Sequence, residues 1–399
     1  MISASEAWRM ISGNISRTSP VTISLDDALG SILGEDIIAP GNIPPFDNAA
    51  MDGYAVRAED IASAPATLRL AGEIAAGHPS PLGLHPQEAL SIMTGAPLPE
   101  GCTAVVQLEW TVQPDTGHVT VVRNVPTGHN IRKKGADIAA GSVALRKGTP
   151  LRPQEIGLLA SLGKRFVTVY QKPRVAVLAT GDELVEIEKP LLPGTIRNSN
   201  AHLLCALIRQ AGCDVAMSEI AKDDPEDLRS KLALCLMADL VVTTGGVSVG
   251  KYDLVCGAFE QQGIKILFRK VNIKPGMPLV FGVKPPAVVF GLPGNPVSTM
   301  VTFLKFVRPA LELMSGRETT GRKYQLHAKL AEAIVKSDAK RHYMRGVLGN
   351  NRDGLVVKPT GSQVSNILTS MVKADCLIML DEEKNRFEAG EVVEIELLP

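Results

Sequence analysis

The chain has 399 residues, of which 45% are hydrophobic and 21% are charged, the composition of a soluble globular protein. Lys plus Arg and Asp plus Glu both number 42, so no net charge attracts nucleic acid or an acidic membrane. The N-terminus lacks the basic start and apolar run of a signal peptide, and no apolar stretch reaches the roughly 20 residues that span a bilayer. We therefore expect a cytoplasmic protein with about two to four domains, because one core rarely serves a chain of this length.

The six cysteines include no C-x-x-C pair. In a chain this long, that pattern argues against a disulfide framework and against a structural zinc site. We expect the cysteines to be small buried residues of the core.

The first part of the chain combines helical and β-prone segments. Residues 1–43 are predicted to be helical, and helical character returns within residues 146–173. Residues 44–145 hold short β-prone runs between Gly and Pro turns, which is typical of a β-rich domain. The sequence therefore predicts a helical or linking domain made of residues 1–43 and 146–173, with a β-rich domain of residues 44–145 inserted into it.

Residues 174–317 alternate strands and helices, which indicates a largely parallel α/β sheet. Asp224-Pro225 and Asn295-Pro296 each place an N-cap before a proline at the start of a helix, and Pro309 is expected to kink or end the last long helix. Residues 318–399 are predicted to be short strands of a separate C-terminal β domain. The predicted fold class is a multidomain α/β plus β protein.

Ligands of an open parallel sheet bind beyond the carboxyl ends of its strands, which directs attention to three loops, at 180–183, 244–250 and 291–296. In the second loop, Gly245 and Gly246 allow backbone N–H groups to approach an anion, and Ser248 adds a hydroxyl. Glycine pairs also form ordinary turns. The two glycines alone are therefore equally compatible with a purely structural turn and with a phosphate-binding loop.

Acidic residues lie at the same ends of the predicted strands. Asp224 is expected to cap a helix, and Asp182 has a possible role in shaping its own turn. Glu183 and Asp253 have no such role, and clustered carboxylates suit a hard cation such as Mg²⁺ with bound phosphate. We therefore predict that Glu183 and Asp253 bind Mg²⁺.

Further segments carry residues of restricted geometry. Lys274 lies at a Lys-Pro-Gly turn, where it suits an anionic ligand, although a solvated lysine is equally compatible with this position. The loops at 44–54 and 93–99 are dense in such residues, which suggests a shaped surface. A basic run at 130–137 ends in Asp137, and such runs are usually solvated.

Together these segments resemble the molybdopterin molybdenumtransferase family, in the same order over nearly the whole chain. The resemblance rests on Pro-Pro-Phe-Asp-Asn-Ala-Ala-Met-Asp-Gly-Tyr at 44–54, Met-Thr-Gly-Ala-Pro-Leu-Pro at 93–99, Thr-Gly-Asp-Glu-Leu at 180–184, Gly-Gly-Val-Ser-Val-Gly at 245–250, Lys-Pro-Gly-Met-Pro at 274–278 and Gly-Leu-Pro-Gly-Asn-Pro at 291–296. Six segments in one order are far more specific than any of them alone.

The resemblance implies a homodimer of four-domain subunits with composite active sites, built around a three-layer α/β molybdopterin-binding domain. It implies insertion of molybdate into adenylylated molybdopterin with Mg²⁺, release of AMP, and a molybdopterin adenylyltransferase as the upstream partner. The catalytic residues implied by position are Asp52, Asp137, Glu183, Asp223 and Asp253. The substrate-binding residues implied by position are Thr94, Gly245, Gly246, Ser248, Lys274, Pro293, Pro296, Arg345 and Ser362.

Two positions depart from the family pattern: Arg197 replaces an aromatic residue, and Thr244 replaces the more common serine. Arg197 leaves the preference between molybdate and tungstate open. Two rival functions also remain, a molybdopterin adenylyltransferase and a scaffold that binds pterin without catalysis. The β-rich domains argue against the first, and the retained acids argue against the second.

Overall fold

The computed structural model describes residues 1–78, 83–246, 252–317, 325–352 and 354–398, except for the side chains of Tyr252 and Asp253. The chain forms two compact units. Unit 1 comprises Met1–Gly34, Gly148–Ile156 and Phe166–Pro399, and unit 2 comprises Glu35–Lys147 and Gly157–Arg165. The finer four-domain boundaries expected from the sequence stay a prediction.

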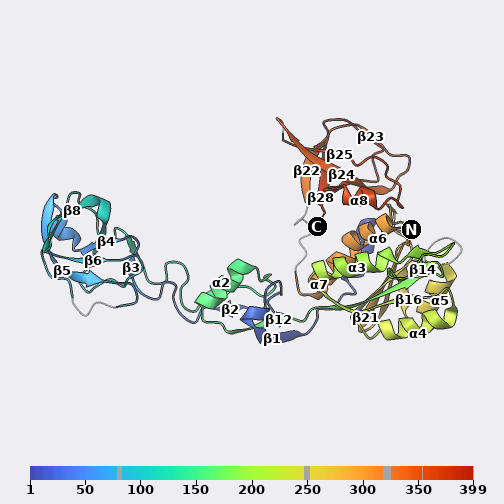
Figure 1. The fold of residues 1–399 in the computed structure, drawn as a ribbon, viewed down its shortest axis with the longest axis horizontal. Coiled ribbons are helices and arrows are strands. Elements are labelled where there is room, and N and C mark those ends of the chain that lie inside the picture. The colour runs from blue at the N-terminus through green and yellow to red at the C-terminus, as the bar shows by residue number, and fades with distance from the viewer. Residues whose placement is uncertain (79–82, 247–251, 318–324, 353, 399) are drawn as a thin grey trace. The chain divides into compact units, whose positions relative to one another are not determined.

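A six-stranded sheet lies at the centre of unit 1 (Figure 1). In spatial order its strands are β16 (Asp214–Ala221), β13 (Arg174–Thr180), β17 (Leu240–Thr244), β21 (Ala287–Leu292), β20 (Val280–Lys284) and β18 (Lys265–Phe268). The first four strands run parallel, and β20 and β18 are antiparallel to their neighbours. The largely parallel sheet expected from the sequence is thus confirmed.

Helices cover both faces of this sheet because its strands alternate their side chains between two cores. Val175 and Val177 pack in one core, together with helices α3 (Ser199–Gln210) and α6 (Pro296–Thr302). Ala176 and Leu178 pack in the other core, together with α4 (Pro225–Cys235) and α5 (Tyr252–Gln261). Figure 1 shows the two helical layers on opposite sides of the strands.

The C-terminal residues form a closed β-barrel. Strand β24 pairs with both β25 and β26, and β22 and β28 complete the ring between them. The barrel strands are β22 (Gln325–Leu330), β24 (Arg341–Asn351), β25 (Gly354–Pro359), β26 (Cys376–Leu380) and β28 (Val392–Leu397). The short strands β23 (Ile334–Val335) and β27 (Arg386–Phe387) pair beside the ring, and helix α8 (Thr369–Val372) precedes β26. The expected C-terminal β domain is confirmed as a barrel.

A buried ion-pair cluster joins the barrel to the α/β domain. The carboxylate of Glu396 on β28, only 4% exposed, contacts both Lys305 and Arg308. Lys305 lies in a π-helical turn (Phe303–Val307) between α6 and α7 (Arg308–Met314). Pro309 follows this turn, and its missing N–H and ring disrupt regular α-helical bonding. The disruption expected at Pro309 is therefore present, as a wide turn rather than an end of the helix.

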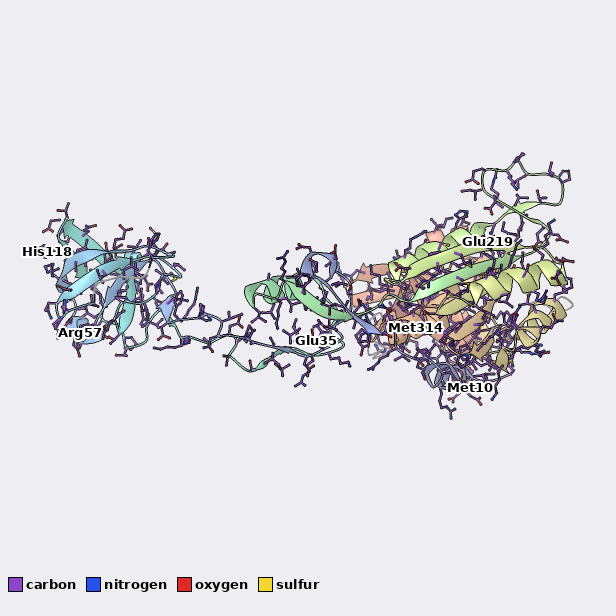
Figure 2. All side chains as sticks on the ribbon, turned by 90° about the horizontal axis from the view of Figure 1, so that it is seen from below. Met10, Glu35, Arg57, His118, Glu219 and Met314 are labelled. Atoms are coloured by element: carbon purple, nitrogen blue, oxygen red, sulfur yellow. The ribbon has the colours of Figure 1, made fainter. Side chains whose placement is uncertain are left out.

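Unit 2 contains a second six-stranded sheet, in the order β7, β4, β6, β5, β9 and β8. Its strands are β4 (Gly53–Val56), β5 (Ala66–Ile74), β6 (Glu88–Ile92), β7 (Ala104–Gln107), β8 (Thr111–Asp115) and β9 (His118–Val121). Figure 2 labels Arg57, which follows β4, and His118, which begins β9. The inserted β-rich domain expected from the sequence is confirmed.

The N-terminal segment is less helical than expected. Helix α1 (Ala4–Ser12) packs Ala7 and Ile11 into the α/β core. Strand β1 (Pro20–Ser24) follows and pairs with β12 (Phe166–Tyr170), because its Val-Thr-Ile run favours a strand. Of the expected second helical stretch, α2 (Pro153–Ser161) forms, and β2 (Ile37–Ile38) pairs with β11 (Val143–Leu145). A shared helical layer made of residues 1–43 and 146–173 was therefore the wrong expectation.

Two whole-chain expectations concern membranes and thiols. Among the described residues, no helix is long and apolar enough to cross a bilayer. All six cysteines are free, and five of them are buried, as expected for small core residues. Burial raises the pKa of the Cys213 and Cys235 thiols to about 12, so neither is a reactive thiolate near neutral pH.

Candidate functional site

Three loops meet at the carboxyl edge of the central sheet, as the sequence predicted. Ala179 on β13 pairs with Thr244 on β17, and Thr244 pairs with Leu292 on β21. Because these strands are parallel neighbours, the residues that follow each strand emerge side by side. The loops that begin at Thr180, Gly245 and Pro293 therefore face a common space.

That space is a pocket of about 1130 Å³ between this edge of the sheet and the barrel. Glu183, Gly245, Gly246, Lys274 and Pro293, all predicted site residues, lie in its lining. The remaining lining residues are Ile196, Ile273, Pro275, Gly276, Met277, Pro278, Gly294, Asn295, Ser298, Lys340, Gln363, Val364 and Ser365. Pro296 is the first residue of α6, directly after Asn295, and is not itself part of the lining.

The two glycines at the base of the pocket are required by space as well as by conformation. Gly245 and Gly246 have φ of 90° and 65°, in the left-handed region. A Cβ at Gly245 would lie 2.4 Å from the Thr180 carbonyl oxygen. A Cβ at Gly246 would lie 2.5 Å from Val255 Cγ2 and 2.8 Å from Thr180 Oγ1. The loop can therefore lie against β13 only without side chains.

A hydrogen-bond network fixes the loops after β17 and β21 to each other. Asn200 Nδ2 donates to Thr244 Oγ1 at 3.1 Å and to the Gly294 carbonyl at 2.7 Å. Thr244 Oγ1 in turn donates to the Pro293 carbonyl at 3.1 Å. Thr244 therefore has the same hydroxyl group as the serine that the resemblance leads us to expect at this position. Thr180 Oγ1 and Asn200 Oδ1 are buried without a hydrogen-bond partner in the described part of the chain.

Lys274 is positioned by the barrel rather than by the central sheet. Strand β19 (Ile273–Lys274) pairs in parallel with β24, placing Lys274 opposite His342. Lys274 Nζ lies 3.0 Å from Asp338 Oδ2. Lys340, on the same barrel segment as Asp338, also lines the pocket. Two cations of the pocket are therefore organised by one segment of the barrel.

Arg345 lies behind the pocket and holds a loop that lines it. Its guanidinium, in a residue only 1% exposed, donates to the Ser370 hydroxyl at 3.1 Å and to the carbonyls of Ser362 and Val364 at 3.3 and 3.1 Å. The backbone of Arg345 also exchanges hydrogen bonds with the Gln363 side chain. Arg345 and Ser362 are thus placed next to the pocket-lining residues 363–365, and neither is itself in the lining.

The acids predicted at the strand ends of the α/β domain differ in where the structure places them. Glu183 lines the pocket, and Asp182 Oδ1 accepts a hydrogen bond from the Asp223 N–H at 3.0 Å, which places Asp223 beside the same loop. The Asp253 side chain and all of Ser248 lie outside the described residues. Asp224 caps α4, accepting from the N–H groups of residues 226 and 227, as expected. Within the described residues, no group of three His, Cys, Asp or Glu side chains lies close enough to hold a metal.

The remaining predicted residues lie together in unit 2. Asp52 Oδ1 accepts from the Thr94 N–H, so the loops at 44–54 and 93–99 meet. Lys133 Nζ and the Lys134 N–H both donate to Asp47, and β3 (Asn48–Ala49) pairs with β10 (Ile131–Arg132). This joins the basic run to the same surface. Asp137, at the end of that run, is exposed.

The arginine at position 197 is used by its own loop. Strand β15 (Ile196–Arg197) pairs with β14 (Leu184–Val185), and Arg197 Nη1 donates to the carbonyls of Ile187 and Lys189. These bonds close the segment between the two strands. Arg197 therefore shapes the edge of the site, next to Ile196 in the pocket lining.

Several lining residues were missed by sequence reasoning. Lys340, Gln363 and Ser365 belong to the C-terminal β domain, which is predicted from the sequence to be separate from the α/β domain. Asn295 was expected to cap α6, but its side chain makes no cap hydrogen bond and donates to Ser365 Oγ at 3.0 Å instead. No local pattern marks these residues, because they reach the pocket through contacts between domains.

Comparisons with known proteins agree with this architecture. Three family models match: the MoeA N-terminal region (domain I and II) over residues 2–163, a probable molybdopterin binding domain over 176–313, and the MoeA C-terminal region (domain IV) over 327–398. The molybdopterin molybdenumtransferase of Haemophilus influenzae is 38% identical over 94% of this chain and 93% of its own. Molybdopterin molybdenumtransferase 2 of Mycobacterium tuberculosis is 37% identical over 99% of both chains.

Among solved structures, the molybdopterin biosynthesis protein moeA from Pyrococcus horikoshii OT3 covers 100% of both chains, with a TM-score of 0.84 and 30% sequence identity. The six ordered sequence segments, the α/β domain with its glycine loop and the barrel are thus accounted for by one family over the full length. The chain belongs to the molybdopterin molybdenumtransferase family.

Proposed function

We propose that this protein inserts molybdate into adenylylated molybdopterin, in the cytoplasm, and so releases AMP and gives the molybdenum cofactor. The observation that carries the proposal is the pocket at the carboxyl edge of the sheet, which combines a glycine loop without side chains, two lysines and one carboxylate. A pterin with two linked phosphates requires these features: room, close backbone approach and cations. Family membership identifies the substrate that has this chemistry.

The residues of the chain have separate roles in this reaction. Gly245 and Gly246 allow backbone N–H groups to approach a phosphate, and Lys274 and Lys340 balance the charge of the phosphates and of molybdate. Asn200 and Thr244 hold the two loops at a fixed separation. Water is consumed as the bond between the two phosphates is cleaved, so AMP leaves with one phosphate and the pterin keeps the other as a phosphate monoester. We assign no covalent intermediate to the protein.

The donor set also fits Mg²⁺. Glu183 lines the pocket, and the buried Thr180 hydroxyl behind Gly246 has no partner in the described part of the chain. Mg²⁺ is usually held by one or two carboxylates together with substrate phosphates and water, so a three-carboxylate cluster is not required. We propose that Glu183 and Asp253 hold Mg²⁺, with Asp223 beside them. When bound, the ion would neutralise charge that develops on the phosphates.

We further propose that the protein acts as a homodimer. In this proposal, Asp52, Thr94 and Asp137 of one subunit complete the site of its partner. The proposal is supported by two observations. The Thr94 N–H donates to Asp52, and the Lys134 N–H of the basic run that ends in Asp137 donates to Asp47 of the same loop as Asp52. Asp52, Thr94 and Asp137 are all exposed. A molybdopterin adenylyltransferase would supply the substrate.

The test is incubation of purified protein with adenylylated molybdopterin, Mg²⁺ and molybdate, followed by measurement of AMP. We expect AMP release that depends on molybdate. A parallel incubation with ATP and unmodified molybdopterin distinguishes the adenylyltransferase activity. Binding of the pterin without molybdate-dependent AMP release would contradict the proposal and favour a scaffold.

A further inference from the structure

The loop 336–340 of the barrel carries an acid that contacts both lysines of the pocket. Asp338 Oδ2 pairs with Lys274 Nζ at 3.0 Å. Asp338 Oδ1 accepts from the Lys340 backbone N–H at 3.3 Å, which fixes the turn that carries Lys340. One carboxylate therefore contacts the ammonium of Lys274 and the backbone of the turn that carries Lys340.

A histidine holds the other side of this carboxylate. His342 Nε2 lies 2.7 Å from Asp338 Oδ1, and His342 is only 7% exposed. The loop is anchored on its far side as well, since Asn272 Nδ2 donates to the Ala339 carbonyl at 3.0 Å. Burial works to raise the pKa of Asp338, but the hydrogen bonds from His342 and Lys274 outweigh it and hold that pKa well below its usual range. Asp338 therefore remains an anion at physiological pH.

Lys274 needs such a partner because its side chain is 49% exposed. A lysine side chain at that exposure, without a partner, samples many rotamers. An anion that binds only one of these rotamers is bound more weakly, because binding then costs the conformational entropy of the lysine side chain. An ammonium group has three N–H donors, so one bond to Asp338 leaves two for a ligand. The ion pair thus restricts the lysine without consuming its capacity to bind an anion.

We propose that Asp338, held in place by His342, is the positioning residue that orients Lys274 and Lys340 toward the anionic group of the substrate. The inference deepens the proposed function and rests on it for the identity of the anion. Asp338 acts through the lysines and does not itself touch the substrate.

The test is a double-mutant cycle on full-length protein with molybdate and AMP as separate probes, measured by equilibrium dialysis. Asp338→Asn keeps an oxygen acceptor for Lys340 but removes the charge. We expect it to weaken binding of at least one probe about two- to fivefold, the range for loss of a half-exposed ion pair. Asp338→Glu should restore at least part of the affinity. In a Lys274→Ala background, Asp338→Asn should have little further effect on the affected probe.

A second measurement follows the position of Lys274 directly. Acetylation by an N-hydroxysuccinimide ester, quantified at Lys274 by mass spectrometry, should be faster in Asp338→Asn than in the unaltered protein. Glu391→Gln is the matched control. It removes the acidic partner of a different lysine on the barrel, the exposed Lys384, whose Nζ lies 2.5 Å from Glu391. This control should change neither the affinities nor the labelling at Lys274.

Two results would overturn the proposal. One is unchanged affinity for both probes and unchanged labelling in Asp338→Asn. The other is an equal loss of affinity with and without Lys274, which would mean that Asp338 does not act through that lysine. Both readouts are independent of turnover, so a failure of molybdate-dependent AMP release by the unaltered protein would count against the proposed function alone.

Discussion

Asp52 and Thr94 lie 42 positions apart in sequence, yet the Thr94 N–H donates to Asp52 Oδ1 at 2.6 Å. Hydrogen bonds from the Thr94 backbone and side chain hold the pKa of Asp52 below its usual range, so the acid is ionised and fixed in direction. Both residues are exposed. An oriented, exposed anion on a rigid surface suits a role in completing the site of another subunit.

The first prediction tests this arrangement. If each site combines Asp52 of one subunit with Glu183 of the other, as we propose, Asp52→Ala and Glu183→Ala homodimers should each be nearly inactive. A heterodimer purified with two different tags would contain one intact site and one doubly altered site. We expect it to recover up to about half of the unaltered activity. A heterodimer as inactive as its parents would place Asp52 and Glu183 in the site of the same subunit, or would mean that the two sites depend on each other.

The second prediction concerns Glu183→Gln. Removing one negative charge from the proposed Mg²⁺ site should raise the Mg²⁺ concentration needed for AMP release by at least about tenfold while the fold stays intact. Glu219→Gln is the control, because Glu219 is exposed on the edge strand β16 of the same sheet (Figure 2). Normal turnover of Glu183→Gln at ordinary Mg²⁺ would remove Glu183 from the mechanism.

The third prediction separates conformation from space in the glycine loop. Gly246→Ala should lower the free energy of unfolding by about 1–2 kcal/mol, because alanine is strained in the left-handed backbone conformation of this position. The contact of the added Cβ with Val255 should lower it further. The substitution should also weaken AMP binding. Gly212→Ala is a matched control, since Gly212 has φ of 80° and no atom within 4 Å of an added Cβ. Chemical denaturation and AMP binding of both variants provide the comparison, and equal effects would show that close approach at Gly246 is unimportant.

The fourth prediction concerns pH. Burial lowers the pKa of His342 below its usual 6.5, although the hydrogen bond with Asp338 opposes the shift. As the pH falls through 6.5, the unfolded chain therefore takes up a proton at this histidine before the folded chain does. The folded barrel should lose stability by at most about 1.4 kcal/mol per pH unit in that window.

His342→Gln keeps an N–H donor for Asp338 but cannot take up a proton. Hydrogen exchange of the β24 amides between pH 7.5 and 5.5 should therefore change less in this variant than in the unaltered protein. An identical pH dependence in both proteins would exclude His342 as its source.

The fifth prediction concerns the choice of oxyanion. Tungstate should compete with molybdate in AMP-release assays, since the two share charge and nearly share size. Arg197 already donates to two carbonyls of its own loop. We therefore expect Arg197→Lys to change little the ratio of the inhibition constant of tungstate to the molybdate concentration that gives half-maximal AMP release. Failure of tungstate to inhibit or substitute at comparable concentration would indicate a more selective site.

The sequence predicted those parts of the molecule that local rules determine. The strand β13, the capped helix α4 and the glycine loop follow from apolar runs, an Asp-Pro pair and two glycines. Within residues 1–43, which are predicted to be helical, Leu25–Asp27 forms only a short 3-10 turn, and the preceding strand β1 pairs with β12, which lies far away in sequence. Lys340 and Asp338 were missed because their role depends on β19 pairing with the barrel.

The longer segment of unit 2, Glu35–Lys147, leaves unit 1 after Gly34 and returns to it at Gly148, and the Gly148 N–H donates to the Leu33 carbonyl at 2.8 Å. The residues that flank this segment are therefore in direct contact. When an insertion leaves and rejoins its host at adjacent residues, each doubling of its length costs only about 0.6 kcal/mol of loop-closure entropy. The length of this segment can therefore change at little cost to the stability of unit 1.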